Sequence, residues 1–430
     1  MILKSAIVVG SGAGGATVAK ELEGHFDVTV LEAGGAFEPF SMSLSAIDTF
    51  KRTGLMFDER EIQLLFPTMR IRKTREKIVL VKGIGLGGTT TIATGSGVRM
   101  DEILMKYGID LSSEYDELER EVPVSTDHQR RWRKATRQLF QVCGEMGLNP
   151  RPTPKMGDGR KCINCGRCVF GCEQGAKWDS RIFLYEAVTK GAKLVTHSAV
   201  NRVVIDGSKA IGVETKRGLG SRFYAADLVV LAAGGFGTPV ILQNSGIECE
   251  RSLFVDPVLC VATLWKDCMQ NKEISMPFIV QRDGYILSPY FDYLSYFFRK
   301  DWNCAANDTL GIMIKVADSS EGTALKNSVE KKLCDRDLCR FEDGVRTCRD
   351  IFRKLEVRDS EIFLGTLNAG HPGGTLPLRD REANSFHSSK LPDNMFVADA
   401  TLLPTSLGNP PIFTIMAMAK RVSRVCLQSA

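Results

Sequence analysis

The sequence lacks the features that mark several protein classes. Its 430 residues contain no apolar run of about 18 residues, the length that a membrane-spanning helix needs. No charged segment with a small-residue cleavage site follows Met1, so we expect no secretory signal. An excess of one charge is also missing, because 56 Lys and Arg against 51 Asp and Glu leave a net charge of +5. That balance is too weak to indicate nucleic-acid binding. We therefore expect a soluble, cytoplasmic protein with no transmembrane segment.

Histidine is scarce, whereas cysteine and glycine are plentiful. The chain has 5 His, 13 Cys and 40 Gly. An odd number of cysteines, some of them closely spaced, fits a reducing compartment better than a disulfide framework. The few histidines can be considered one by one. His25, His128, His197 and His387 lie in links or polar stretches, and we predict that each is a surface or turn histidine.

The first motif is a glycine-rich turn between an apolar strand at residues 7–9 and a helix at 16–22. Three glycines match the pattern GxGxxG: the first allows a tight turn, the second a close approach to a pyrophosphate, and the third helix-to-strand packing. The helix N-terminus offers N–H groups to phosphate. A second strand at 27–31 ends at Glu32, which can accept hydrogen bonds from a ribose. The motif predicts a dinucleotide site and does not separate NAD from FAD. Its residues are Gly10, Gly12, Ala13, Gly14 and Gly15.

Three later stretches repeat the order strand, loop, helix. A second glycine-rich loop occupies residues 82–91. An apolar strand at 227–233 leads through glycines into a helix that ends near residue 245. Close to the C-terminus, a strand at 394–400 is followed by a Gly-Asn-Pro-Pro turn and a helix at 412–425. These repeats suggest one nucleotide domain built from distant segments.

Through these motifs the chain resembles the glucose–methanol–choline (GMC) oxidoreductases, flavoenzymes that oxidise alcohols. The family's FAD fingerprint, its two signatures and its C-terminal block resemble, in order, GSGAGG, GIGLGGTT, AAGGFGTPVILQNSGI and VADATLLPTSLGNPPIFTIMAMAKRV. The resemblance implies FAD and disfavours a NAD-dependent reductase. No histidine occurs at residues 92–95, after the first signature, so the FAD is expected to be noncovalent. The expected flavin contacts are the motif residues named above, Glu32, Gly87, Gly88, Thr89, Val203, Ala233, Gly234, Asp399, Ala400, Asn409 and Pro410.

The resemblance also implies the fold class. We expect an α/β protein, α+β overall, with a Rossmann-like FAD-binding domain made of discontinuous segments and a substrate domain with a largely antiparallel sheet. The FAD-binding domain is predicted at 1–254 and 372–430, with a cysteine-rich insertion at 155–180, and the substrate domain at 255–371. Within the latter we predict helices at 327–333 and 342–355.

His371 stands apart from the other histidines because it lies in the glycine-rich segment Asn-Ala-Gly-His-Pro-Gly-Gly-Thr. The family carries its catalytic histidine in a similar setting, and its second catalytic position is a His or an Asn, here Asn409. A positioned imidazole can accept the hydroxyl proton of an alcohol as hydride leaves the carbinol carbon for flavin N5. We therefore predict His371 and Asn409 as the catalytic pair, against the alternatives of a turn histidine and a turn-forming asparagine.

A cysteine run departs from this picture. Cys162, Cys165, Cys168 and Cys172 have the spacing C-x₂-C-x₂-C-x₃-C, which is that of a bacterial ferredoxin. We predict one [4Fe–4S] cluster, held either by all four or by three of them with another cysteine in place of Cys172. Zinc, a structural thiol loop and disulfides are the alternatives. Long-chain alcohol oxidases and sugar dehydrogenases of the wider family carry a similar stretch, which supports membership but not the cluster.

A cluster would change the function, because it passes electrons singly. We predict a dehydrogenase, not an oxidase, that takes a small-molecule alcohol and delivers electrons to a protein acceptor. The alternative is an electron-transfer subunit of a larger redox complex. Three other stretches stay open to more than one interpretation. The aromatic segment 290–298 is core, the lining of a substrate pocket or a partner surface. The basic segment 130–137 is a solvated face or a docking face, and residues 40–80 are a lid or a linker.

Overall fold

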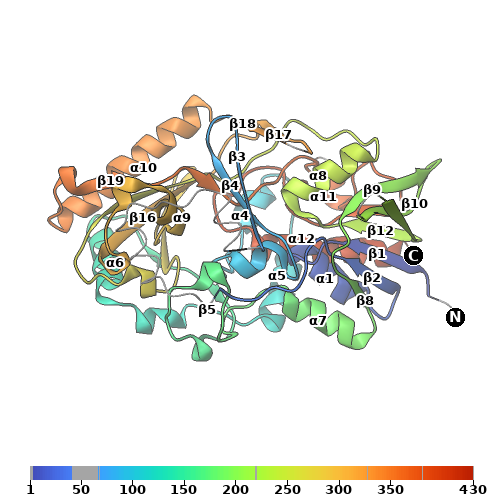
Figure 1. Cartoon of the computed structure of the whole chain (residues 1–430), viewed down its shortest axis with the longest axis horizontal. Coiled ribbons are helices and arrows are strands. Elements are labelled where there is room, and N and C mark those ends of the chain that lie inside the picture. Colours follow the sequence, from blue (N-terminus) through green and yellow to red (C-terminus); the bar gives the residue numbers. More distant parts are fainter. Residues whose placement is uncertain are drawn as a thin grey trace.

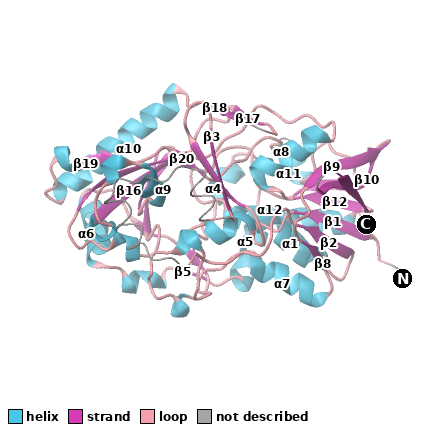
Figure 2. Ribbon diagram, in the orientation of Figure 1, coloured by secondary structure: helices cyan, strands magenta, loops and turns pink. Residues whose placement is uncertain are grey.

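The computed structural model of the chain describes residues 3–40, 66, 68–217, 220–326, 328–379 and 381–429. Most of the segment predicted as a lid or linker, at 41–65 and 67, lies outside the described residues. A parallel sheet flanked by helices occupies the end of the molecule where both termini lie, and a larger sheet occupies the opposite end (Figures 1 and 2). In the part of the chain that is described, no helix is long and apolar enough to cross a membrane.

The parallel sheet has five strands in the order β21-β12-β1-β2-β8. They are Met395–Val397, Leu228–Leu231, Ser5–Val9, Asp27–Leu31 and Lys193–Val195. All their pairings are parallel. β1 lies between β2 and β12, so the strand order reverses there, and ligands bind such sheets at the carboxyl ends of the strands beside this point. The predicted strands at 7–9, 27–31, 227–233 and 394–400 all lie in this sheet.

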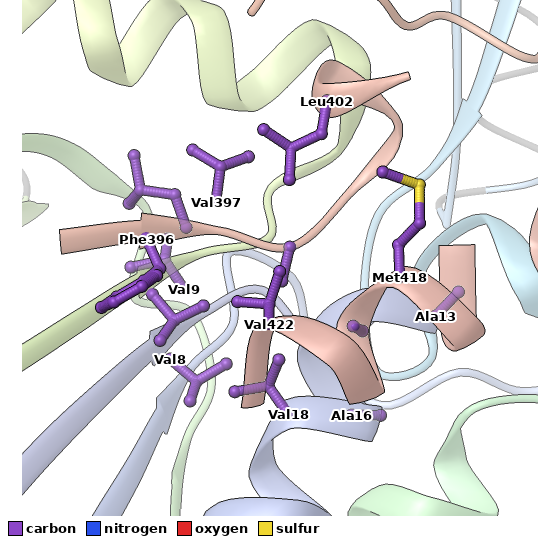
Figure 3. Close-up of a cluster of buried hydrophobic side chains, with 14 of the residues drawn as sticks. Val8, Val9, Ala13, Ala16, Val18, Phe396, Val397, Leu402, Met418 and Val422 are labelled. Carbon is purple, nitrogen blue, oxygen red and sulfur yellow. The ribbon is translucent and has the colours of Figure 1, made fainter. Parts of the chain in front are cut away.

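Two helices that are distant in sequence pack together on this sheet. α1 (Ala13–Leu22) and α12 (Ile412–Gln428) place Val18 and Val422 in one buried cluster with residues of β1 and β21 (Figure 3). Gly14 allows α1 to approach the end of β21 closely, since a Cβ there would lie 1.6 Å from the carbonyl oxygen of Ala398. The C-terminal segment therefore completes the layer that holds the first glycine-rich turn.

Further elements surround this sheet. A three-stranded antiparallel sheet, β11-β10-β9, lies beside it and consists of Gly220–Ala225, Lys209–Arg217 and Val200–Asp206. The helices near it are α5 (Ser112–Glu121), α7 (Arg181–Lys190), α8 (Gly234–Asn244) and the short α4 (Asp101–Met105) and α11 (Glu382–Ser385).

The larger sheet has nine strands, eight of them in the order β3-β4-β20-β13-β16-β15-β14-β6, with β19 paired to β13. Its pairings are antiparallel except that between β20 and β4. This confirms the predicted antiparallel character. In that order the strands are Met69–Lys73, Val79–Gly83, Asn368–Ala369, Val258–Leu264, Thr309–Val316, Tyr285–Pro289, Phe278–Arg282 and Arg151–Pro152, and β19 is Ile362–Leu364.

The sheet draws strands from outside the predicted substrate domain. The hairpin β3–β4 and the short β6 precede residue 255, yet they pair with strands that follow it. Helices α6 (Lys134–Glu145), α9 (Tyr293–Phe298) and α10 (Asp335–Lys354) pack on this sheet or beside it. The predicted helix at 342–355 is the second half of α10, which begins earlier because Cys334 and Asp337 form a capping box.

The predicted helix at 327–333 is wrong. Residues Val329–Lys331 form strand β18, which pairs with β17 (Gly322–Ala324). The burial alternates along β18, with Val329 and Lys331 inside and Glu330 outside, which is the period of a strand. Lys331 misled the sequence prediction because it is a charged residue that is buried with a partner, Asp318. A second small pair of strands, β5 and β7, consists of Val124–Ser125 and Lys155–Met156.

Candidate active site

A cavity of about 360 Å³ opens at the carboxyl end of β1. The turn from β1 to α1 lines it with Gly10, Ser11, Gly12, Ala13 and Gly14. The first turn of α1 presents backbone N–H groups there, and its N-cap, Gly12, has no capping side chain to satisfy them. A Cβ on Gly12 would meet no protein atom within 4 Å, so the space in front of this residue is open for a ligand. The turn has the form of an anion-binding cradle.

Glu32 lies in the wall of this cavity and is buried. One carboxylate oxygen accepts the N–H and hydroxyl of Ser11, at 3.0 and 2.7 Å. The other accepts the N–H groups of Gly34 and Gly85, at 2.9 and 3.2 Å. Glu32 thus connects the first glycine-rich turn to the second. The ribose contact predicted for it would be made by a carboxylate that the chain already holds in place.

Most of the predicted flavin contacts line the same cavity. Besides the residues of the first turn, they are Gly88, Thr89, Ala233, Gly234, Asp399 and Ala400. Asp399 joins two of these segments, since its carboxylate accepts the N–H of Gly234 at 2.8 Å and the hydroxyl of Thr238 at 2.5 Å. Burial raises the pKa of Asp399. Segments that are distant in sequence are therefore brought to one site, as the strand–loop–helix repeats predict.

Other predicted contacts lie elsewhere among the described residues. Gly15 lies behind the turn, where a Cβ would be 2.0 Å from the carbonyl oxygen of Gly10. Gly87 donates its N–H to the hydroxyl of Ser11 at 3.2 Å. Val203 is buried in β9, and its N–H is bound by Ser245. Pro410 lines a second cavity, described below. Gly15, Gly87 and Val203 thus lie outside the lining of the cavity of about 360 Å³, which we call the cofactor cavity, and Pro410 belongs to the second cavity.

The basic side chains of the cofactor cavity were not predicted from the sequence. Arg70 and Arg72 of β3 and Lys82 of β4 line it. Burial and the two arginines lower the pKa of Lys82 to about 8. Three cations in one wall favour an anionic ligand such as a diphosphate. The alternation Met-Arg-Ile-Arg-Lys of β3 is the signal in the sequence that a strand presents these arginines on one face.

A second cavity of about 160 Å³ adjoins the first. Its lining is mainly apolar, and aromatic side chains from three segments contribute to it: Phe66, Phe170, Tyr290, Tyr293 and Phe297. The segment 290–298 thus belongs to the core and also lines a pocket, because most of its side chains are buried and several face the second cavity. The two cavities share Thr89, Ala93, Gly370, His371 and Ile412 in their walls.

His371 lies at this junction, and its side chain is 26% exposed because it faces both cavities. Its Nδ1 atom is 3.5 Å from a carboxylate oxygen of Asp256 and has no hydrogen-bond partner among the described residues. The separation is slightly longer than a hydrogen bond, and such contacts often tighten when substrate binds. Burial and the ammonium of Lys315 lower the pKa of His371, against the opposing effect of Asp256. A neutral imidazole is the form that can accept a proton.

Asn409 lies in the turn before α12 and is buried. Its side-chain amide donates to Gln281 at 3.1 Å, and its backbone carbonyl accepts from Lys315 at 3.2 Å. Asn409 lines neither cavity within the described structure, whereas the adjacent Pro410 lines the second. The structure thus brings His371 to the predicted place and orients the amide of Asn409 toward the larger sheet.

The four cysteines of the run line one further cavity, of about 60 Å³, which shares Thr94 and Gly95 with the apolar cavity. All four are free thiols. The sulfur of Cys172 accepts the N–H groups of Ala176 and Lys177 at 3.3 and 3.5 Å. Burial raises the pKa of Cys162 and Cys165. Across the described chain, no three or more His, Cys, Asp or Glu side chains are gathered as they would be around a metal ion.

Two buried lysines line the cysteine cavity. The ammonium of Lys177 donates to four carbonyl oxygens, those of Thr90, Thr91, Ala93 and Cys168. The ammonium of Lys155 donates to two carbonyls and the hydroxyl of Ser96. No carboxylate of the described residues lies within ion-pair distance of either. Burial lowers the pKa of Lys155 to about 7 and that of Lys177 to about 8.

His128 was predicted to be a surface or turn histidine, and it lies in the 3₁₀ turn Asp127–Arg131 but is buried there. His128 is 5% exposed, its Nδ1 accepts from the indole of Trp132 at 3.0 Å, and its Nε2 lies 2.9 Å from the carbonyl oxygen of Thr153. Burial lowers its pKa to about 4. The basic residues that follow it hid this role, because they indicated an exposed segment. His25 and His197 are exposed, as expected.

Comparisons with known proteins identify the family. The family model described as GMC oxidoreductase matches residues 5–259, more than half of the chain. The chain belongs to the GMC oxidoreductase family. The GMC family binds FAD, and the open space before Gly12, the free N–H groups of α1 and the three cations of β3 and β4 fit a dinucleotide with a diphosphate.

Individual relatives differ in how much they share with the chain. Protein MJ1450 of Methanocaldococcus jannaschii is 26% identical over 98% of this chain and 99% of its own length. A long-chain-alcohol oxidase, FAO4B of Arabidopsis thaliana, is 27% identical over 59% of this chain and 36% of its own length. The crystal structure of a pyridoxine 4-oxidase from Mesorbium loti, 16% identical, superposes with a TM-score of 0.71 over 98% of both chains. The last comparison confirms the α/β fold of a GMC oxidoreductase.

Proposed function

We propose that this GMC oxidoreductase is an FAD-dependent dehydrogenase that oxidises a small-molecule alcohol to a carbonyl compound, with His371 as the base. The observation that carries the proposal is the position of His371 in the wall shared by the cofactor cavity and the apolar cavity. A group at that junction can contact a substrate hydroxyl while the carbinol carbon faces the cofactor. The domain division at residues 254/255 and 371/372 stays a prediction.

Different residues of the chain would accept the proton, hold the carbon skeleton and bind the substrate oxygen. Bound FAD would supply the two-electron acceptor for the hydride of the carbinol carbon. His371 accepts the hydroxyl proton on Nε2, because Nδ1 faces Asp256. The aromatic wall excludes water and holds the carbon skeleton. Asn409 is the second group of the proposal, and its amide would exchange Gln281 for the substrate oxygen.

The apolar cavity limits the substrate. Its volume of about 160 Å³ is close to that of an engineered apolar cavity of about 150 Å³ that binds benzene in another protein. We therefore expect an uncharged alcohol with a single ring or a short branched chain. Sugars and long-chain alcohols fit less well, the former because of their hydroxyl groups and the latter because of their length.

The test is anaerobic bleaching of the flavin by a panel of alcohols. Benzyl alcohol is expected to reduce the bound FAD, while glucose and hexadecanol are expected to leave it oxidised. The readout is the loss of flavin absorbance. If no primary or secondary alcohol of any size reduces the flavin, the alcohol dehydrogenase proposal is wrong and an electron-transfer role takes its place.

We also propose that Cys162, Cys165, Cys168 and Cys172 hold a [4Fe–4S] cluster. The ferredoxin spacing and the common cavity of the four thiols support it. So do the ammonium groups of Lys155 and Lys177, because a buried cation is costly without a nearby anion, and thiolates on iron would supply one.

The cluster proposal is tested by iron and sulfide analysis of protein purified without oxygen. We expect about four irons and four sulfides per chain. Cys165→Ser is expected to lose most of both, and the matched change Cys339→Ser, at an exposed cysteine outside the run, is expected to retain them. Zinc in place of iron, or equal iron in the two variants, would contradict the proposal.

A cluster in the cysteine cavity, which adjoins the apolar cavity, favours the dehydrogenase mode. A bound cluster would supply a one-electron acceptor, and a protein could then receive the electrons. Iron-loaded enzyme turning over in air is therefore expected to produce little hydrogen peroxide. Vigorous peroxide production would indicate an oxidase. The free thiols suit the reducing cytoplasm, which we propose as the location.

One observation favours a second candidate, the electron-transfer subunit. The basic segment 130–137, for which the sequence leaves a solvated face and a docking face open, lines a groove with Arg131, Arg133, Lys134 and Arg137, and Asn164 of the cysteine run lies in the same groove. Arg131 and Asn164 also line the cysteine cavity. A cationic surface at this place would suit an acidic protein acceptor. Such a partner is compatible with either function, and the alcohol panel separates the two.

A further inference from the structure

One buried ion pair lies beside His371, and a second lies behind the first. In the first, the ammonium of Lys315 contacts the carboxylate of Asp256, and both side chains are 1% exposed. In the second, Lys331 lies 2.8 Å from Asp318, and both are fully buried. The two pairs are linked, because Asp318 accepts the N–H groups of Val255 and Asp256 at 3.1 and 2.9 Å. Asp318 thereby fixes the backbone that carries Asp256.

The first pair contacts both predicted catalytic groups. Asp256 faces Nδ1 of His371 at 3.5 Å and also accepts the hydroxyl of Ser406. Lys315 donates to the backbone carbonyl of Asn409 at 3.2 Å. Asp256 precedes β13, Lys315 lies in β16, and both line the apolar cavity. The pair thus joins the larger sheet to the His371 loop and to the turn before α12.

Stability alone is a poor explanation for this pair. Moving two charges out of water costs free energy that their mutual attraction often does not recover, and apolar replacements of similar volume are frequently neutral or stabilising. The chain places the pair where three segments of the proposed site meet, and its negative end is directed at the ring atom that decides the tautomer of His371. The arrangement resembles a carboxylate that holds a catalytic imidazole in one tautomer.

We propose that Asp256 and Lys315 are a positioning pair for the reaction: Asp256 holds His371 with Nδ1 protonated and Nε2 free, and Lys315 keeps that imidazole neutral until the substrate proton arrives. The inference rests on the proposed role of His371 as the base. Neither Asp256 nor Lys315 transfers a proton in it.

The two charges act on His371 in opposite directions. Asp256 favours the imidazolium and Lys315 disfavours it, and burial adds to the effect of Lys315. No other charged side chain of the described residues shifts the pKa of His371, since Asp318 is held by Lys331 one layer behind. Removing Lys315 should therefore raise the pKa of His371, and removing the charge of Asp256 should lower it.

The experiment is an imidazole NMR titration of FAD-loaded protein labelled with ¹⁵N in histidine. With 5 His in the chain, the His371 signal is assigned by its loss in His371→Ala. In the wild type, Nδ1 is expected to carry the proton. Lys315→Met is expected to raise the titration midpoint of His371 by about one pH unit or more, and Asp256→Asn to lower it by a similar amount. Lys315→Arg keeps the charge and should restore the midpoint of the wild type.

A double variant keeps the test decisive if either single change unfolds the chain. Asp256→Asn/Lys315→Met leaves no unpaired buried charge, and its midpoint should return toward that of the wild type while the preference for protonated Nδ1 is lost. Single variants that leave the midpoint unchanged, or that shift it in the same direction, overturn the positioning pair. So does a wild-type His371 with its proton on Nε2.

This outcome is separable from failure of the proposed function. If His371→Ala still reduces its flavin with benzyl alcohol at the rate of the wild type, the base is misassigned and the positioning role fails with it. If that variant is inactive while the midpoint of His371 is insensitive to Lys315 and Asp256, the base stands and only the positioning pair is wrong.

Discussion

Replacing His371 with alanine is expected to slow reduction of the bound flavin by about 10²–10⁴-fold, the usual contribution of a positioned general base. The physical reason is that a hydroxyl proton must leave as the carbinol carbon gives up its hydride, and the variant has no group at the cavity junction to receive it. The measurement is single-turnover flavin reduction by the best alcohol of the panel, without oxygen.

The FAD content of His371→Ala is expected to equal that of the wild type, because the glycine-rich turn, Glu32 and the cations of β3 and β4 line the cofactor cavity independently of His371. The matched control is His25→Ala, at an exposed turn after α1 and outside both cavities. If His371→Ala reduces flavin as fast as His25→Ala, His371 is not the base. If it loses FAD instead, His371 is a cofactor-binding residue.

The rate should also depend on pH in a defined direction. Only the neutral imidazole accepts a proton, so the rate falls as the pH drops through the pKa of His371. Burial and Lys315 lower that pKa, and full activity should therefore extend below the pH at which an ordinary histidine becomes protonated. Rapid-mixing rates over a pH series check this. An acid limb above the ordinary range would indicate that Asp256 dominates over Lys315.

Local signals in the sequence were sufficient for the core of the parallel sheet and for the glycine-rich turn that follows β1. Each glycine-rich stretch follows an apolar strand and precedes a helix, and the predicted strands at 7–9, 27–31, 227–233 and 394–400 all lie in one parallel sheet. That order also gave the cofactor cavity, because the carboxyl ends of parallel strands meet at one edge. The predicted His371 lies in its wall.

The pairing of strands that are far apart in the chain could not be predicted from the sequence. The hairpin β3–β4 lies more than 280 residues before its partner β20, and nothing local to either segment records the contact. Its arginines were therefore missed as part of the cofactor cavity. A buried charge, Lys331 in β18, caused one of the other errors, and the exposed basic run after His128 hid the burial of that histidine. The ion pairs behind His371 were missed for the same reason.

The Gly12→Ala variant is expected to fold like the wild type and to lose FAD affinity by tenfold or more, which corresponds to about 1.4 kcal/mol. A Cβ at Gly12 meets no protein atom within 4 Å, and the φ angle of −71° at this residue suits alanine. The methyl group would point into the cradle where the backbone must approach the diphosphate closely. Flavin fluorescence on release and titration of the apoprotein with FAD measure the change.

The matched control is Gly144→Ala in α6, where a Cβ also meets nothing within 4 Å. Alanine stabilises a helix by up to about 1 kcal/mol relative to glycine, so this variant should melt at the same or a higher temperature and keep its FAD. Gly14→Ala gives the opposite pattern, because its Cβ would lie 1.6 Å from the carbonyl oxygen of Ala398 and must disrupt the packing of α1. Loss of FAD with an unchanged apoprotein melting temperature in Gly12→Ala alone locates the diphosphate at this turn. Equal FAD affinity in Gly12→Ala and the wild type would place it elsewhere in the cavity.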